Sequence, residues 1–228
     1  MAVRTGDLAR RVGGAIGIAP EGVTIAFAVL VAGASALALG WHWTGVAAIL
    51  FGLAIAAFFR DPERLPANSS SERMVLSGAD GTVSDVAEMP LPDGAAGEHY
   101  HRVSVFMSPL NVHVNRAPVG GEITSVRHTP GAFHAAFRDY ASERNERNLI
   151  VLSDARGRQH AMMQIAGYLA RRIVCRLHPH DMVRCGERIG LIMFGSRVDH
   201  FIPPDYRVVV KIGERVRAGE SIIGELLQ

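Results

Sequence analysis

Charged residues are missing from one long stretch near the N-terminus. Residues 22–59 contain no Asp, Glu, Lys or Arg, and the stretch is bounded by Glu21 and Arg60. Its apolar part continues well beyond the core of a secretory signal peptide, which argues against a cleaved leader. Two apolar runs, 23–39 and 44–59, approach the length of about 17 residues that is the lower limit for crossing a bilayer. We therefore expect a membrane helical hairpin over residues 23–59.

Arginine and tryptophan mark the ends of this expected hairpin. The arginines on its two sides are Arg4, Arg10, Arg11, Arg60 and Arg64. Because positively charged flanks stay on the cytoplasmic side, we expect both ends in the cytoplasm, with Trp41 and Trp43 at the opposite interface. The alternatives are a re-entrant hairpin that does not cross the membrane and a pair of buried core helices.

The hairpin divides the chain into segments. Residues 1–22 form an expected cytoplasmic N-terminal segment, and residues 60–73 are polar and rich in Pro and Ser, which is typical of a linker. Residues 74–228 form the remaining domain. The formal net charge is only +2, so no global field favours nucleic acid as a partner.

Cysteine is also scarce, which excludes disulfide scaffolds. Cys175 and Cys185 are the two cysteines, and their spacing is not that of a structural zinc site, so we expect buried thiols.

The histidine pairs at 99 and 101 and at 178 and 180 could each face one side of a strand. No ordered set of further ligands accompanies them, so the sequence predicts no metal.

The domain after the linker has the sequence pattern of an antiparallel β fold. Short β-rich runs alternate with Gly and Pro turns, which favours a mainly β class, α+β at most, over repeated βαβ units. Residues 133–145 could hold a short helix. The expected strands are 82–87, 102–107, 122–127, 149–153, 160–166, 188–194 and 207–212.

A Gly-Ser pair, Gly195-Ser196, ends one of these apolar runs. Such pairs are common in turns, but glycine after a buried strand also permits a strained peptide whose carbonyl the neighbouring hydroxyl can attack. The peptide would become an ester, and elimination and hydrolysis would leave a pyruvoyl group at residue 196. A positioned base is required, because a serine hydroxyl is a weak nucleophile.

Other motifs precede this pair. They are Phe59 to Pro62, Ser77 to Gly81, Phe106 to Pro118, His128 to Phe133 and Asn145 to Arg147. Together with Gly195-Ser196, in this order and spacing, they resemble the phosphatidylserine decarboxylase family in its short prokaryotic form. The resemblance covers roughly residues 58 to 228.

This resemblance implies an activity and a maturation. The chain would be a proenzyme that cleaves itself into residues 1–195 and 196–228, with the pyruvoyl group from Ser196 as its covalent cofactor. That group would form a Schiff base with the serine headgroup and decarboxylate phosphatidylserine to phosphatidylethanolamine, at the cytoplasmic face of the inner cell membrane. The two chains would stay together as a heterodimer, and further dimerisation is left open.

The resemblance also suggests residues for the chemistry. Asp80 matches the family's aspartate, and His113 matches the first of two histidines that larger members carry three residues apart. Arg116 stands where the second would be, so a literal Ser-His-Asp relay is in doubt here. We expect His113 to serve the Schiff-base chemistry and Asp80 to orient or activate. Arg116 could bind the headgroup phosphate or be a surface residue, and His128 could bind substrate or take over one role of His113.

The C-terminal tail has a second likeness. Residues 209–224 resemble the hammerhead of biotinyl and lipoyl domains, in which Gly-x-x-Val-x-x-Gly supplies turns. Carriers of that kind need an exposed lysine at a hairpin tip. Lys211, the only lysine, falls inside a strand-like run, so we interpret the likeness as shared β architecture rather than as a swinging arm.

Two other function classes compete with a decarboxylase. A serine hydrolase could use Ser196, His113 and Asp80, but the Gly-x-Ser-x-Gly elbow is absent. A non-enzymatic membrane adaptor with a lipoyl-like domain would show no cleavage. Among pyruvoyl enzymes, those acting on soluble amino acids would not need the hairpin, so the hairpin favours a lipid substrate.

Overall fold

The computed structural model describes residues 14, 16–64, 73–92, 99–134, 144–168, 172–193 and 195–227. The chain divides into two units, residues 1–63 and 64–228. Most of the expected N-terminal segment, most of the 60–73 linker, the interior of the possible helix at 133–145 and Phe194 lie outside the described residues. Arg64, within the expected linker 60–73, belongs to the second unit.

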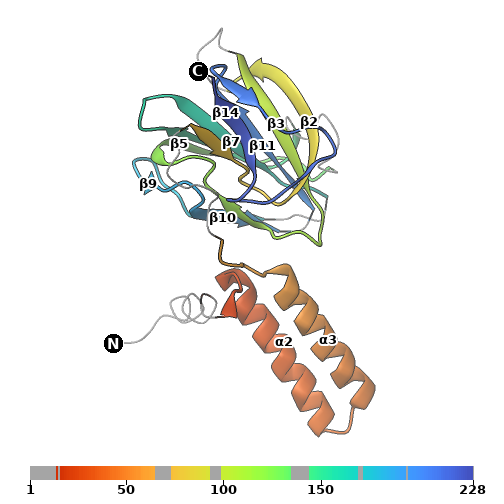
Figure 1. Cartoon of the computed structure of the whole chain (residues 1–228). Coiled ribbons are helices and arrows are strands. Elements are labelled where there is room, and N and C mark those ends of the chain that lie inside the picture. The colour runs from red at the N-terminus through yellow and green to blue at the C-terminus, as the bar shows by residue number, and fades with distance from the viewer. Residues whose placement is uncertain are drawn as a thin grey trace, which may run out of the picture. The chain divides into compact units, whose positions relative to one another are not determined.

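The first unit is the expected pair of apolar helices, α2 (Pro20–Ala38) and α3 (His42–Phe58), which lie side by side in Figure 1. Glycine makes this packing possible, because a Cβ on Gly33 would lie 2.9 Å from Ile49 Cγ1 and one on Gly45 would lie 2.6 Å from Leu37. Helix α2 is long and apolar enough to cross a membrane by length and composition, and α3 is a shorter apolar helix.

The second unit is built from antiparallel strands, which confirms the expected fold class. The strands are β1 (Met74–Leu76), β2 (Gly81–Pro90), β3 (His99–Met107), β4 (Val114–Arg116), β5 (Gly121–Thr129), β6 (Arg147–Ser153), β7 (Gln159–Ile165), β8 (Ile173–Cys175), β9 (Met182–Val183), β10 (Arg188–Ile192), β11 (Ser196–Ile202), β12 (Tyr206–Val208), β13 (Arg215–Val216) and β14 (Ile222–Leu226). The large sheet has the order β13-β2-β3-β11-β7-β6-β5-β9, and two small sheets have the orders β1-β14-β12 and β4-β10-β8.

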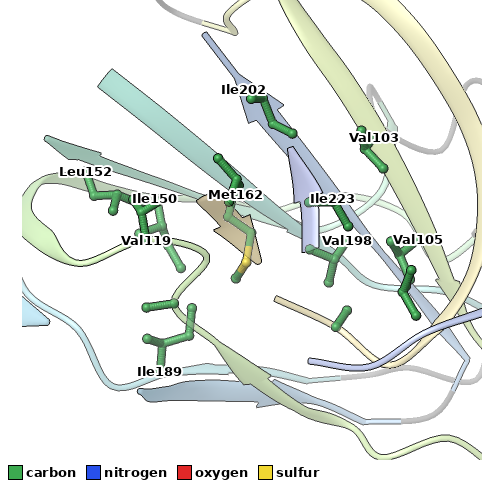
Figure 2. Packing of buried hydrophobic residues seen from close by; sticks show 14 of the residues in the cluster. Val103, Val105, Val119, Ile150, Leu152, Met162, Ile189, Val198, Ile202 and Ile223 are labelled. Atoms are coloured by element: carbon green, nitrogen blue, oxygen red, sulfur yellow. The ribbon is translucent and has the colours of Figure 1, made fainter. Parts of the chain in front are cut away.

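The main hydrophobic core lies on one face of the large sheet. Figure 2 shows Val105 of β3, Val198 of β11 and Met162 of β7 in this core. Ile189 of β10 and Ile223 of β14 come from the two small sheets and pack in the same cluster. The small sheets therefore close the core over the face of β11 that carries Val198.

A second apolar cluster buries the other face of β11, through Phe201 with Tyr100 and Met163. Every residue of β11 is buried as a result. Arg197 and Asp199 on this face form a buried ion pair, with Arg197 Nη2 donating to Asp199 Oδ2 over 2.9 Å. Pairing is what allows these charges to be buried, since an isolated buried charge would be far more costly.

Two sequence expectations about strands are wrong. Strand β11 was not expected, although it lies between β3 and β7 in the large sheet. The expected strand 207–212 ends at Val208, and Lys211 is exposed next to the turn at Ile212-Gly213, where Gly213 has φ +90°. The turn takes Lys211 out of the sheet, so its position in a strand is no argument against a lysine carrier.

Candidate active site

Ser196 is the first residue of β11 and is fully buried. It lies opposite Met107, the last residue of β3, and its Oγ donates to Met107 Sδ over 3.4 Å. Gly195 before it has φ +56°, a left-handed conformation that L-residues other than glycine adopt at a cost. A Cβ at Gly195 would meet nothing within 4 Å, so backbone conformation, not space, is what favours glycine here.

A chain of buried amides ends beside Ser196. Asn148 Nδ2 donates to Gln164 Oε1 over 3.0 Å, and Gln164 Nε2 donates to Asn115 Oδ1 over 2.9 Å. Asn115 Nδ2 then donates to the Gly78 carbonyl and contacts Met107 Sδ at 3.8 Å. Asn115 and Ser196 therefore share the sulfur of Met107. The three amides define what we call the amide chain (Asn115, Gln164 and Asn148).

His113 is buried two residues before Asn115. Its Nδ1 lies 3.0 Å from the Asn111 carbonyl. A carbonyl only accepts, so Nδ1 carries the proton and the basic nitrogen of a neutral ring is Nε2. The His113 carbonyl accepts from the Ile192 amide over 3.3 Å, which ties His113 to the end of β10, three residues before Gly195.

Asp80 is held by an arginine from the start of the second unit. Arg64 Nη1 lies 2.5 Å from Asp80 Oδ1 and Arg64 Nη2 lies 2.8 Å from Oδ2, a bidentate pair with both side chains nearly buried. The Ala218 amide also donates to Asp80 Oδ1, over 2.8 Å. These contacts fix the Gly78 to Gly81 loop, whose Gly78 carbonyl meets Asn115.

The structure does not bring the side chains of Arg116 and His128 beside Ser196. Arg116 is buried and donates to the Gly186 carbonyl over 3.0 Å; as the neighbour of Asn115 on β4, it points to the opposite face of the strand. His128, on β5, is half exposed, with Nε2 3.1 Å from Glu146 Oε1. Strands β6 and β7 separate β5 from β11, so His128 is not brought beside Ser196.

A further histidine, His200, lies under the same loop. Its Nε2 accepts from the Gly78 amide over 2.7 Å, and its Nδ1 donates to the Val103 carbonyl over 3.2 Å. Burial lowers the pKa of His200 to about 4, against the smaller opposing effects of the Val103 carbonyl and Asp199. With both nitrogens engaged, His200 supports the loop and is not placed to act as a base.

From the sequence, no role in the site is expected for the amide chain or for His200, and Arg64 is expected only at the flank of the hairpin. The sequence does mark two members of the amide chain, because Asn148 and Gln164 are uncharged polar residues within otherwise apolar runs. Such residues are stable in a core only when hydrogen-bonded.

Ser196 begins a strand, whereas the nucleophile elbow of α/β-hydrolases joins a strand to a helix. The described residues contain no cluster of three or more His, Cys, Asp or Glu suited to a metal.

Fold and site together define a class: a mainly antiparallel β protein with an apolar helical hairpin and a Gly-Ser pair whose serine is buried at the start of a central strand. The model of the phosphatidylserine decarboxylase family matches residues 51–224, and the chain belongs to this family. This membership gives no support to a serine hydrolase or a membrane adaptor.

Curated relatives show the same similarity over most of their length. The phosphatidylserine decarboxylase proenzyme of Chlorobium chlorochromatii is 47% identical over 177 residues, covering 78% of this chain and 81% of the relative. That of Mycolicibacterium smegmatis is 44% identical over 191 residues, covering 81% and 80%. That of Magnetococcus marinus is 41% identical over 217 residues, covering 92% and 95%.

Proposed function

We propose that this chain is a self-processing, pyruvoyl-dependent decarboxylase that converts phosphatidylserine to phosphatidylethanolamine in phospholipid biosynthesis. The family supports the substrate and the reaction. The observation that carries the self-processing is Ser196, whose hydroxyl is fully buried directly after a left-handed glycine.

Self-processing begins at the Gly195-Ser196 peptide. Ser196 Oγ attacks the Gly195 carbonyl carbon, and the peptide C–N bond breaks as the ester C–O bond forms, with the hydroxyl proton passing to a base and a proton reaching the new amine. Loss of the Ser196 Cα proton then expels Gly195 as a carboxylate and leaves dehydroalanine. Water converts this enamine to a ketone and releases ammonia. General-base assistance of this kind is typically worth about 10² to 10⁴ in rate.

His113 is the proposed base and later proton donor. Its Nδ1–H is fixed on the Asn111 carbonyl, which leaves Nε2 to take and return a proton. Asn115 is the proposed N–H donor toward the oxyanion that forms at Gly195, because its Nδ2 contacts the same sulfur as Ser196 Oγ. Asp80 acts as a positioning residue, through Arg64 and the Gly78 loop.

The surroundings of Ser196 fit a pyruvoyl group. Its contact is a thioether, which is neutral and soft, and the nearest amide is a neutral donor. A pyruvoyl group supplies an electrophilic ketone and an electron sink for the pair left when carbon dioxide departs. Around it, buried strands exclude water, and His113 can hold the proton that returns to the substrate carbon.

Cleavage need not release the small chain. Residues 196–228 include β11, whose residues Ser196 to Ile202 pair with Met107 to His101 of β3, and β11 also pairs with β7. The same segment supplies β12, β13 and β14. We therefore propose that the two products remain a tightly held heterodimer.

The lipid substrate accounts for the apolar hairpin. We propose that α2 and α3 anchor the enzyme in the cell membrane with the second unit at the cytoplasmic face. Headgroup binding by Arg116 and His128 stays a prediction; His128 is the more exposed of the two.

A single substitution tests this function. Ser196→Ala should leave one uncleaved chain that does not decarboxylate phosphatidylserine, because no hydroxyl is present to attack Gly195. Ser125→Ala, at an exposed position of β5, is the matched control and should be cleaved and active. Cleavage or activity in the Ser196 variant would contradict the proposal. An intact wild-type chain that carries a titratable serine and does not decarboxylate phosphatidylserine would instead favour a hydrolase.

A further inference from the structure

Apolar side chains are exposed on loops at one end of the strands of the large sheet. Six large hydrophobic residues are exposed in the described part of the second unit: Leu110, Phe133, Tyr168, Met182, Ile212 and Leu227. Three of them lie on loops that follow strand ends, with exposed fractions of 84% for Leu110, 74% for Tyr168 and 37% for Phe133. Exposed apolar side chains that lie near one another are typical of a surface that meets a partner or a membrane.

The strand register places these three loops at the end of the sheet where Ser196 lies. Ser196 is opposite Met107, three residues before Leu110. Its neighbour Arg197 is opposite Ile165, three residues before Tyr168. Ile165 is in turn opposite Arg147, and Arg147 is opposite Thr129, four residues before Phe133. Successive strands are about 4.8 Å apart, so the loops of Leu110 and Tyr168 flank the end of β11 that carries the reactive serine, and the loop of Phe133 lies three strands away at the same end of the sheet.

A buried asparagine holds two of these loops in place. Asn145 Oδ1 accepts from the His134 amide over 3.0 Å, and Asn145 Nδ2 donates to the His134 carbonyl over 2.7 Å. The same Nδ2 donates to the Ala166 carbonyl over 2.7 Å. The loops that carry Phe133 and Tyr168 are therefore linked through one side chain, so their apolar groups are presented together.

Cationic side chains accompany the apolar ones. Arg144 is exposed, and its carbonyl accepts from the Ala132 amide over 2.8 Å, next to Phe133. Arg172 is exposed, and its carbonyl accepts from the Met193 amide over 3.1 Å, two residues before Gly195. Apolar groups beside arginines are the composition that binds the interface of an anionic membrane.

We propose that this rim (Leu110, Phe133 and Tyr168, with Arg144 and Arg172) inserts into the interfacial region of an anionic lipid bilayer. The proposal rests on the proposed function for its purpose: a headgroup must reach the buried Ser196 while its acyl chains stay in apolar surroundings. The rim would be the part of the second unit that meets the lipid, so that the substrate passes from the bilayer to Ser196 without crossing water.

Depth-dependent fluorescence tests the insertion. The full chain, with Trp41 and Trp43 replaced by Phe, is reconstituted in phosphatidylserine-containing vesicles whose acyl chains carry bromine. We expect strong quenching for Tyr168→Trp and Leu110→Trp. Leu227→Trp is the matched control: Leu227 is also exposed, but its amide bonds to Asp205, beyond the opposite end of β11. Equal quenching at all three positions, or none at the rim, would overturn the proposal. Rim fluorescence that instead depended on protein concentration would show a second copy of the chain as the occupant and would also overturn it.

A kinetic comparison separates this proposal from the proposed function. Tyr168→Asp should lower the ratio of activity on phosphatidylserine vesicles to activity on a monomeric short-chain phosphatidylserine by about tenfold or more, because it removes one inserted apolar side chain. Leu227→Asp should leave the ratio unchanged. An unchanged ratio in the Tyr168 variant contradicts the rim. A wild-type chain that decarboxylates neither substrate contradicts the proposed function, while the quenching result still decides on the rim.

Discussion

Two sets of buried polar side chains meet at the Gly78 to Gly81 loop. One is the ion pair of Asp80 and Arg64, and the other is the neutral amide chain. On one side, Asp80 is paired with Arg64 and with the Ala218 amide. On the other, the neutral amide chain ends at the Gly78 carbonyl and at the sulfur beside Ser196. The carboxylate is thus already satisfied by a cation, and the groups described in contact with Ser196 are neutral. The difference suggests that Asp80 shapes the loop while proton transfer falls to His113.

The ion pair should show the largest effect on stability. Asp80→Ala leaves the buried guanidinium of Arg64 without its carboxylate partner. Arg64→Ala leaves the buried carboxylate of Asp80 without its cationic partner. We expect either change to lower the free energy of unfolding by about 3 to 5 kcal/mol, as for other broken buried pairs. Denaturant unfolding in detergent measures this.

A comparison of two single variants separates positioning from chemistry. If Asp80 acts by positioning, Asp80→Asn and Arg64→Met should slow self-cleavage to similar extents. A severe loss of cleavage for Asp80→Asn alone would show that the carboxylate itself takes part in the chemistry. The exposed pair Arg207 and Glu225 is a suitable control, since surface pairs contribute at most about 1 kcal/mol.

Acid pH would place charge on two buried histidines, His200 beneath the Gly78 loop and His160 beside Asp154. Burial lowers the pKa of His200 and of His160 to about 4, from an ordinary 6.5. Between these values the unfolded chain binds protons that the folded chain does not, so the free energy of unfolding should fall as pH drops from about 6.5 to 4. The loss is at most about 3 kcal/mol for each histidine.

Denaturant unfolding at pH 7 and at pH 5 checks this slope. His160→Gln should make the dependence shallower by about one proton, because it removes one group that titrates only when unfolded. His178→Gln, at an exposed position, should leave the slope as it is. An equal slope in the His160 variant would contradict the shifted pKa.

For each buried group that loses a partner, breaking the amide chain should cost less than breaking the ion pair, because the amide groups are neutral. Gln164→Leu leaves Asn115 Oδ1 and Asn148 Nδ2 buried without these partners, at about 1 to 3 kcal/mol for each group. We also expect slower self-cleavage, because Asn115 loses the contact that orients its amide. Rates from the appearance of the small chain measure this. Gln164→Glu, which keeps an acceptor for Asn148 but loses the donor to Asn115, should slow cleavage as well; normal cleavage in both variants would remove Asn115 from the mechanism.

The smallest expected change in stability is at Gly195. Gly195→Ala fits sterically, since nothing lies within 4 Å of the added Cβ, but the left-handed backbone should cost about 1 to 2 kcal/mol. Self-cleavage should be slower, because the new residue favours another conformation of the scissile peptide. Gly157→Ala, at another positive-φ turn, is the control and should be cleaved at the normal rate.

Much of the β architecture could be predicted from apolar runs, but the central strand could not. Arg197, Asp199 and His200 interrupt the pattern of β11, and only their partners in the folded protein make their burial acceptable. The candidate site shows the same limit. Gly195, Ser196 and His113 stand out by motif, whereas the Arg64 to Asp80 to Ala218 contact joins residues far apart in the chain, which no local pattern reveals.

The most direct test of self-processing is the intact mass of the purified chain under denaturing conditions. We expect two species, residues 1–195 and a piece from residue 196 to 228 that is lighter by one ammonia than a peptide beginning with serine. A single species with the mass of the whole chain, from protein that is active on phosphatidylserine, would contradict self-processing.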